Sequence, residues 1–164
     1  MTPSMLDINS LFSAGGALAR SVPGYIARPQ QREMAQAIAD TIASNTILIA
    51  EAGTGTGKTF AYLVPALMTG GKVIISTGTK TLQDQLFNRD IPTVQSALKV
   101  PVTVALLKGR ANYVCHYHLE RTFQESRPAL VSREEVKYLN LIERYARVSK
   151  SGDKSGVSEV PENA

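Results

Sequence analysis

Short apolar runs alternate with helical patterns along the first two-thirds of the chain. The runs occupy residues 47–50, 73–76 and 102–107 and consist mainly of Ile, Val and Leu. Runs of this length and composition are typical of buried strands. Their alternation with helical stretches is typical of a parallel sheet with helices packed on its faces. The pattern therefore predicts an α/β lobe.

A helix is predicted over residues 29–44, because a proline suits its first turn and apolar residues recur at every fourth position. The recurring residues, which we expect to form a buried stripe, are Met34, Ile38 and Ile42. Further helical stretches are predicted over 60–68, over 81–88 and beyond Pro92. Pro65 falls inside the first of these stretches, which must tolerate it or kink there.

Beyond the third run the pattern is helical. A helix is predicted over 112–124, and Ser132 with Glu135 has the pattern of a capping box that begins a second helix ending near Ser149. The apolar residues of that second helix fall three apart and are Val136, Leu139, Ile142 and Tyr145. One face of it is therefore expected to pack. Residues 150–164 are polar and lack aromatic side chains, which predicts a disordered tail.

The segment between the first apolar run and the next helix has the pattern of a Walker A phosphate loop. It consists of Ala52, Gly53, Thr54, Gly55, Thr56, Gly57, Lys58 and Thr59, and it departs from that pattern only at its first position. Its glycines let successive N–H groups face one anion, Lys58 can reach the terminal phosphates, and the Thr59 hydroxyl can hold Mg²⁺. A flexible Gly/Thr linker is the alternative, but a strand before the loop and a helix after it favour a nucleotide site.

Two further groups of polar residues are candidates for contacts with ligands. The segment 76–86 follows the second run, and its Thr77, Thr79 and Lys80 are suitable donors to the phosphates of a nucleic-acid backbone. An ordinary capped loop explains these residues equally well. The amide of Gln31 can donate and accept at an adenine edge. On spacing alone, a solvated helix glutamine is the simpler interpretation.

Cys115 is the one cysteine of the chain, which excludes an internal disulfide framework. His116 and His118 lie beside it and suggest zinc. A structural zinc site needs four ligands, however, and the two histidines fall on different helix faces. Zinc is therefore disfavoured, and a lone buried thiol is the simplest interpretation from these residues.

Composition sets outer limits on the function. The net charge of +4 is compatible with a polyanionic partner, although the basic residues are scattered. A length of 164 residues suffices for one domain but not for two nucleotide-binding lobes. No stretch has the length of a membrane span and the N-terminus has no signal pattern, so we expect a cytoplasmic protein without a membrane partner. The absence of an Asn-Lys-x-Asp guanine reader argues against a GTPase.

Four stretches of the chain together resemble the iron–sulfur DNA helicases of the DinG/YoaA type, in the XPD-like branch of superfamily 2, in both their order and their spacing. The stretches are residues 28–34, 51–59, 75–86 and 107–115. The resemblance implies an incomplete RecA-like ATP-binding lobe over 1–107 and the helical start of an iron–sulfur cluster domain over 108–149. It implies that Gln31 lies on the adenine side, that residues 77–80 touch single-stranded DNA, and that Cys115 is the first of four cluster cysteines in the parent protein.

The chain departs from that family pattern in what it lacks. It contains neither the other three cluster cysteines nor an apolar strand that ends in the Asp-Glu pair of motif II. We therefore expect the N-terminal part of an ATP-dependent DNA helicase, acting 5′ to 3′ in replication or repair. It would bind ATP and Mg²⁺ through Lys58 and Thr59, the candidate catalytic residues. We expect a 4Fe-4S cluster only in the full-length parent, contacts with single-stranded DNA and with replication or repair proteins, and no hydrolysis by this chain alone.

Two other classes of function remain open from the residues. One is a small phosphotransferase that uses the same phosphate loop, although we identify no catalytic base and no arginine-bearing lid for it. The other is a module without enzymatic activity that binds nucleotide or protein.

Overall fold

The computed structural model describes residues 7–125 and 132–157, which fall into two compact units. Unit 1 comprises residues 1–106 and unit 2 comprises residues 107–164. The phosphate loop lies in unit 1, and Cys115 lies in unit 2. Each unit is described by itself. None of the helices in the described ranges is long and apolar enough to cross a membrane.

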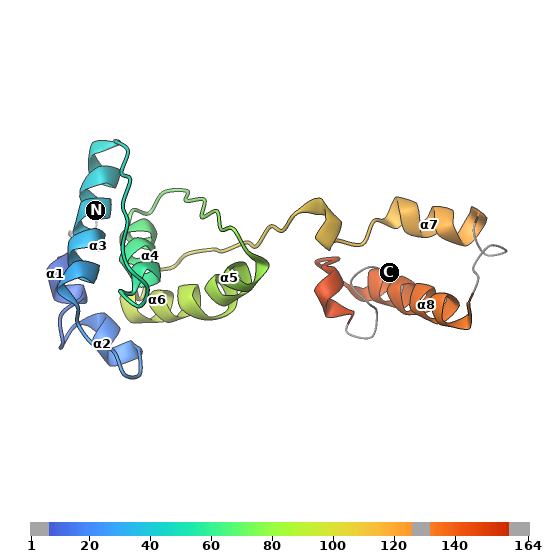
Figure 1. Cartoon of the computed structure of the whole chain (residues 1–164), viewed down its shortest axis with the longest axis horizontal. Coiled ribbons are helices and arrows are strands. Elements are labelled where there is room, and N and C mark those ends of the chain that lie inside the picture. The colour runs from blue at the N-terminus through green and yellow to red at the C-terminus, as the bar shows by residue number, and fades with distance from the viewer. Residues whose placement is uncertain (1–6, 126–131, 158–164) are drawn as a thin grey trace. The chain divides into compact units, whose positions relative to one another are not determined.

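Unit 1 is a helical assembly built around the helix that follows the phosphate loop (Figure 1). Its elements are α1 (Ile8–Leu11), α2 (Ala17–Ser21), α3 (Pro29–Ser44), α4 (Lys58–Met68), α5 (Lys80–Gln85), the π-helical turn η1 (Leu86–Asp90) and α6 (Ile91–Leu98). Helix α4 packs against both α3 and α6, and Ala61, Leu63 and Val64 are fully shielded from solvent. It accommodates Pro65 within its buried length. Because the core forms around α4, the core fixes the end of the phosphate loop.

The predicted helix over 29–44 is confirmed by α3. Pro29 occupies its first turn, and Asn45 ends it in the left-handed conformation with φ of 52°. The predicted buried stripe is wrong in part, since Ile42 is 41% exposed. The residues of α3 that are buried are Gln31 and Ala35, one turn apart. The recurrence of apolar residues at every fourth position thus identified the helix. Its buried face, however, is not centred on those residues and includes the polar side chain of Gln31.

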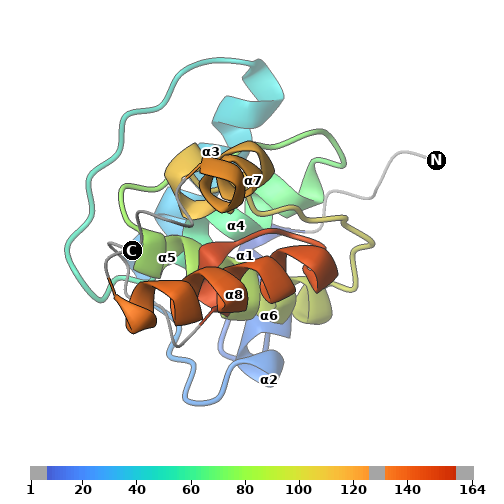
Figure 2. The same cartoon turned by 90° about the vertical axis from the view of Figure 1, so that its right-hand side faces the viewer.

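The structure contradicts the predicted parallel sheet, and the assignment of an α/β RecA-like lobe is wrong. Within the described ranges, the β contacts are limited to one isolated antiparallel bridge between Tyr113 and Asp153. The runs 47–50, 73–76 and 102–107 form no strand. Ile49 and Ile74 are each 95% exposed, and Figure 2 shows the chain between α3 and α4 as an open arc outside the helices.

The error has a physical cause. A strand becomes part of a sheet only through hydrogen bonds to a neighbour about 4.7–4.9 Å away, and an apolar run contains no information about that neighbour. The third run packs in another way: Val102 and Val104 are partly buried against the helical core. Gln95 of α6 donates to the Val102 carbonyl at 2.6 Å. In the third run the apolar pattern thus predicted residues that are partly buried, but the contacts that bury them are with helices.

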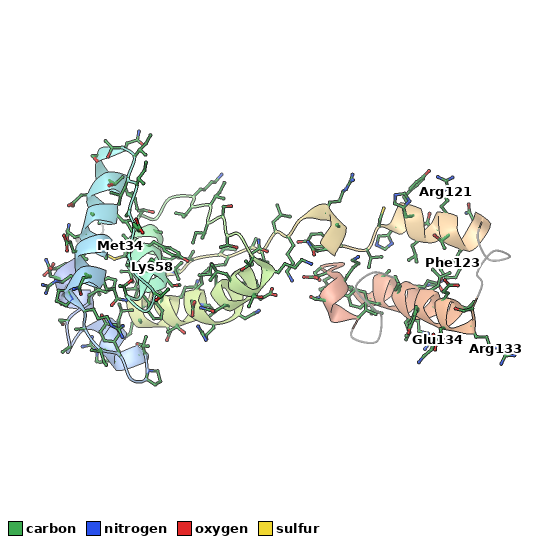
Figure 3. The ribbon with its side chains drawn as sticks, in the orientation of Figure 1. Met34, Lys58, Arg121, Phe123, Arg133 and Glu134 are labelled. Atoms are coloured by element: carbon green, nitrogen blue, oxygen red, sulfur yellow. The ribbon has the colours of Figure 1, made fainter. Side chains whose placement is uncertain are left out.

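The described residues of unit 2 form two helices and two short turns. Its elements are η2 (Arg110–Asn112), α7 (His116–Glu125), α8 (Arg133–Val148) and η3 (Lys154–Gly156). Helices α7 and α8 pack on each other. In Figure 3, Phe123 lies on the side of α7 that faces α8, and Arg121 lies on the opposite side. The helix predicted over 112–124 begins later, at His116, because residues 110–112 form a 3₁₀ turn.

The capping box predicted for the second helix is confirmed. The Ser132 hydroxyl accepts from the Glu135 N–H at 3.1 Å, and the Glu135 carboxylate accepts from the Ser132 N–H at 3.0 Å. Helix α8 starts at the next residue and ends at Val148, close to the predicted end. Of the four apolar positions on its predicted face, Leu139, Ile142 and Tyr145 are half-buried. Val136, in its first turn, is exposed.

The beginning and the end of unit 2 are joined by an ion pair of low exposure. The Lys108 ammonium lies 2.8 Å from the Asp153 carboxylate, and the two side chains are 6% and 18% exposed. The Val114 N–H donates to the Gly152 carbonyl at 2.8 Å. Residues 150–157, the described part of the expected tail, therefore carry specific hydrogen bonds. Residues 158–164 lie outside the described ranges.

Asp153 makes the stability of unit 2 depend on pH. Burial raises the pKa of its carboxyl, but hydrogen bonds from Lys108 and Ser155 and the charge of Lys108 outweigh it, so the pKa lies below 3.8. The contribution of this carboxylate to stability is therefore complete above about pH 5, and it is lost as the pH falls through the unfolded and then the lower folded pKa. We predict that Asp153→Asn lowers the free energy of unfolding at pH 7 by about 2 kcal/mol. Thermal unfolding followed by circular dichroism from pH 7 to pH 2.5 measures both effects.

Glu143→Gln is the matched control, because it removes one carboxylate from an exposed i,i+4 pair with Arg147 on α8. Such a pair contributes about 0.3–0.5 kcal/mol, so the control should unfold almost as the wild type does. Equal losses in the two variants at pH 7 would show that the Lys108–Asp153 pair has no special role.

Candidate nucleotide-binding site

The phosphate loop leads directly into the first turn of α4. Gly55 and Gly57 have φ of 77° and 80°, in the left-handed region that favours glycine. Gly57 is the N-cap of α4 and supplies no side-chain hydrogen bond to the first turn. The first N–H groups of an α-helix lack partners inside the helix, and they carry part of the positive end of its dipole. The start of α4 is therefore suited to an anion.

Lys58 lies folded over the loop that precedes it. Its ammonium donates to the carbonyls of Ala52 and Gly53, at 2.5 and 2.7 Å. The Gly53 carbonyl also accepts from the Thr56 hydroxyl at 2.9 Å. Figure 3 labels Lys58, the first residue of α4. The two carbonyls hold the ammonium at the loop.

Thr59, the expected Mg²⁺ ligand, lies beside a half-buried tyrosine. Burial raises the pKa of the Tyr62 hydroxyl, a hydrogen bond with the Thr59 side chain lowers it, and the charge of Asp90 raises it again. A hydroxyl that donates its proton keeps lone pairs with which it can bind a cation. Among the described residues, however, no three His, Cys, Asp or Glu side chains are grouped to hold a metal ion.

Gln31 connects α3 to the loop. Its side chain is buried, at 2% exposed, and its amide nitrogen donates to the Gly57 carbonyl at 2.9 Å. Its amide oxygen accepts from the Tyr25 hydroxyl at 3.2 Å. The expectation of a solvated glutamine is therefore wrong. A polar residue within a predicted helix gave no signal of this contact, because its partner lies 26 residues away in the sequence.

A pocket of about 400 Å³ opens beside the end of the loop. It is lined by Val22 and Pro23 after α2, by Gly57 and Thr59, and by Arg89 and Asp90 of η1, among others. Asp90 is buried, and its carboxylate accepts from the Gln85 amide at 2.8 Å and from the Arg89 guanidinium at 2.9 Å. Sequence reasoning missed Asp90, since a single acidic residue before an Ile-Pro pair has no distinctive pattern.

The expected DNA-contacting residues form the start of α5. The Thr79 hydroxyl accepts from the Leu82 N–H at 3.3 Å and so caps the helix. The Thr77 hydroxyl donates to the Thr79 carbonyl at 3.3 Å. Lys80 is exposed. The two threonines thus have the contacts of a capped loop, whereas the Lys80 side chain is open to solvent.

Cys115 is exposed and has no disulfide partner. The interpretation of a buried thiol is therefore wrong. It lies between the 3₁₀ turn η2 and the first residue of α7, His116. A 4Fe-4S cluster needs four protein ligands, almost always thiolates, and one cysteine does not provide them. The described residues by themselves therefore do not form a cluster site.

Comparison with known proteins identifies the family. Residues 28–132 match the DEAD/DEAH box helicase family, so the chain belongs to it. It is 43% identical over 158 residues to the ATP-dependent DNA helicase YoaA of Haemophilus influenzae, covering 96% of this chain and 24% of that protein. It is 56% identical over 110 residues to YoaA of Escherichia coli, covering 67% of this chain and 17% of that protein.

A third relative carries a different name. The 3′-5′ exonuclease DinG of Bacillus subtilis is 41% identical over 113 residues, which cover 66% of this chain and 12% of that protein. The chain thus spans at most about a quarter of the length of these relatives. No solved structure matches it.

Two glycines of the loop offer a paired test of its geometry. A Cβ on Gly57 would lie 2.1 Å from the Gln31 amide nitrogen, whereas a Cβ on Gly55 would have nothing within 4 Å. Both substitutions place alanine at a positive φ, which costs about 1–2 kcal/mol. We predict that Gly57→Ala lowers the free energy of unfolding of unit 1 more than Gly55→Ala does, because it also displaces Gln31. Urea denaturation of both variants measures the difference, and equal losses would contradict the Gln31–Gly57 contact.

Proposed function

We propose that this chain is the ATP-binding part of a DNA helicase. The observation that carries the proposal is the position of the Lys58 ammonium, held by two carbonyls over a loop that ends in an N-terminal helix turn without a side-chain cap. Membership of the DEAD/DEAH box helicase family supports ATP as the nucleotide. The pocket beside Thr59 supports it further, since Val22 and Phe60 offer apolar surface to a base and a ribose.

The proposed binding step is an exchange of partners. The Lys58 ammonium leaves the carbonyls of Ala52 and Gly53 and binds the terminal phosphates, whose hydrogen bonds to a cation are stronger than those of neutral carbonyls. The N–H groups of the loop and of the first turn of α4 bind the remaining phosphate oxygens. Thr59 would hold Mg²⁺, a cation that neutralises phosphate charge and orients the terminal phosphate. Exchange of partners lets the loop stay ordered before nucleotide arrives.

Hydrolysis needs groups that this chain does not contain. Its sequence has no Asp-Glu pair after an apolar run, and such a pair holds Mg²⁺ and positions the attacking water in phosphate-loop hydrolases. Positioning and charge stabilisation provide almost all the catalysis of phosphoryl transfer. We therefore propose that this chain alone binds ATP and does not turn it over at an enzymatic rate.

Single-stranded DNA is the proposed macromolecular partner. Lys80 is exposed beside the Thr77–Thr79 turn, and the chain has a net charge of +4. Contacts of this kind bind phosphates without reading bases and weaken as salt rises. From the resemblance we also propose 5′ to 3′ movement, a role in replication or repair, and Cys115 as a cluster ligand where a longer protein supplies the other three.

Replacement of Lys58 tests the proposed function. We predict that Lys58→Ala weakens the binding of Mg-ATP by about tenfold to a hundredfold, which is the effect of one charged hydrogen-bonding group. Isothermal titration calorimetry measures it. Lys72→Ala is the matched control, because it removes an exposed lysine of unit 1 outside the loop and should bind as the wild type does.

Equal affinities in the wild type and Lys58→Ala would contradict the assignment of the site. Phosphate release by the same proteins, at saturating single-stranded DNA, tests the proposed lack of hydrolysis. A turnover of several per second that Lys58→Ala abolishes would show that the chain has a catalytic carboxylate of its own.

A further inference from the structure

The hydroxyl of Tyr25 lies at one end of a hydrogen-bond chain that reaches the phosphate loop. Tyr25 is in the segment between α2 and α3, and its hydroxyl is 3.1 Å from the Phe12 carbonyl and 3.2 Å from the Gln31 amide oxygen. Gln31 in turn donates to the Gly57 carbonyl. The chain of contacts therefore runs from the end of α1, through Tyr25 and the buried amide of Gln31, to the residue before Lys58.

The Gly57 carbonyl and the Tyr25 hydroxyl together fix which way the amide of Gln31 points. A phenol has one proton to donate, and both of its neighbours here are acceptors. Because the Gly57 carbonyl can only accept, the amide turns its nitrogen to that carbonyl and its oxygen to the Tyr25 hydroxyl, which donates to it. Burial raises the pKa of the Tyr25 hydroxyl, and the nearby charge of Arg28 only partly reverses this, so the hydroxyl keeps its proton at neutral pH. The reversed amide would set oxygen against the carbonyl oxygen of Gly57.

The Gly57 carbonyl belongs to the same planar peptide group as the Lys58 N–H. A hydrogen bond that holds the carbonyl therefore also fixes the direction of that N–H. The same carbonyl accepts from the Ala61 N–H at 3.2 Å, the first bond of α4. Gln31 thus supplies a second, lateral constraint on a peptide group whose glycine would otherwise rotate easily.

We propose that Tyr25 is a positioning residue for the phosphate loop and acts through Gln31. The role rests on the proposed binding of ATP, and it concerns the phosphates of the ligand. Tyr25 and Gln31 hold the Gly57–Lys58 peptide so that its N–H faces the anion before the anion arrives. Gln31 then contributes to affinity through the loop. The competing role for Gln31 is recognition of adenine. The contacts with Tyr25 and Gly57 leave one N–H and one lone pair on the amide, and these would bind the base.

A ligand without a base separates the two roles. Isothermal titration calorimetry is carried out with Mg-ATP and with magnesium tripolyphosphate on the wild type, Tyr25→Phe and Gln31→Glu. Tyr25→Phe keeps the ring and removes the hydroxyl, and we expect it to weaken both ligands by the same factor, about three to ten, the effect of one neutral hydrogen bond. Gln31→Glu replaces the donor to Gly57 by a carboxylate of nearly equal size. It should weaken both ligands more strongly.

Tyr145→Phe in unit 2 is the matched control, since it removes a phenol that donates to the Asp153 carbonyl and leaves the loop untouched. The Lys58 backbone amide supplies a spectroscopic readout: its ¹⁵N–¹H resonance should shift in Tyr25→Phe and stay in place in Tyr145→Phe. An altered amide resonance together with a common loss for both ligands supports the positioning role, whatever happens to the melting temperature.

Other outcomes would overturn the role in distinguishable ways. If the wild type binds both ligands and Tyr25→Phe binds tripolyphosphate equally well, the positioning role is wrong and ATP binding stands. A loss for ATP alone assigns Gln31 to the base and likewise overturns it. A wild type that binds neither ligand overturns the proposed function, and the positioning role with it.

Discussion

The contact between Gln31 and Gly57 is the constraint on which the loop depends. The Gln31 amide nitrogen lies 2.9 Å from the Gly57 carbonyl oxygen. This approach is open because Gly57 has no Cβ, which would lie only 2.1 Å from the same nitrogen. This buried polar contact joins α3 to α4, and the packing of α4 in the core prevents the loop end from moving away. A positive φ at Gly57 and a buried amide on α3 are therefore parts of one arrangement.

Local interactions explain what could be predicted from the sequence. The helix over 29–44, the Ser132–Glu135 capping box and the loop over 52–59 each depend on residues a few positions apart, and the two helices are found as expected. The sheet was mispredicted because strand pairing depends on distant partners that apolar runs do not specify. The contact of Gln31 with Gly57 and the pair of Asp153 with Lys108 were missed for the same reason, whereas Asp90 was missed because the sequence does not show that it is buried. Their contacts cross between elements or rest on burial that spacing does not reveal.

The two units differ in how polar groups stabilise them. In unit 1 a neutral amide is buried beside a loop whose lysine binds backbone carbonyls, which leaves the cation able to change partners. In unit 2 the Lys108 ammonium binds a carboxylate whose pKa is lowered by that contact, and this pair joins distant parts of the unit. The ammonium of Lys58 therefore has neutral partners that a ligand could replace, whereas that of Lys108 is paired with a carboxylate inside the unit.

A crystal structure of the chain with magnesium and a non-hydrolysable ATP analogue tests the exchange of partners most directly. The account predicts the Lys58 ammonium about 2.7–2.9 Å from a terminal phosphate oxygen, having left the carbonyls of Ala52 and Gly53. It also predicts that the Gln31–Gly57 hydrogen bond is retained. A nucleotide bound elsewhere, or a Lys58 still on its own carbonyls with the phosphates distant, would contradict it.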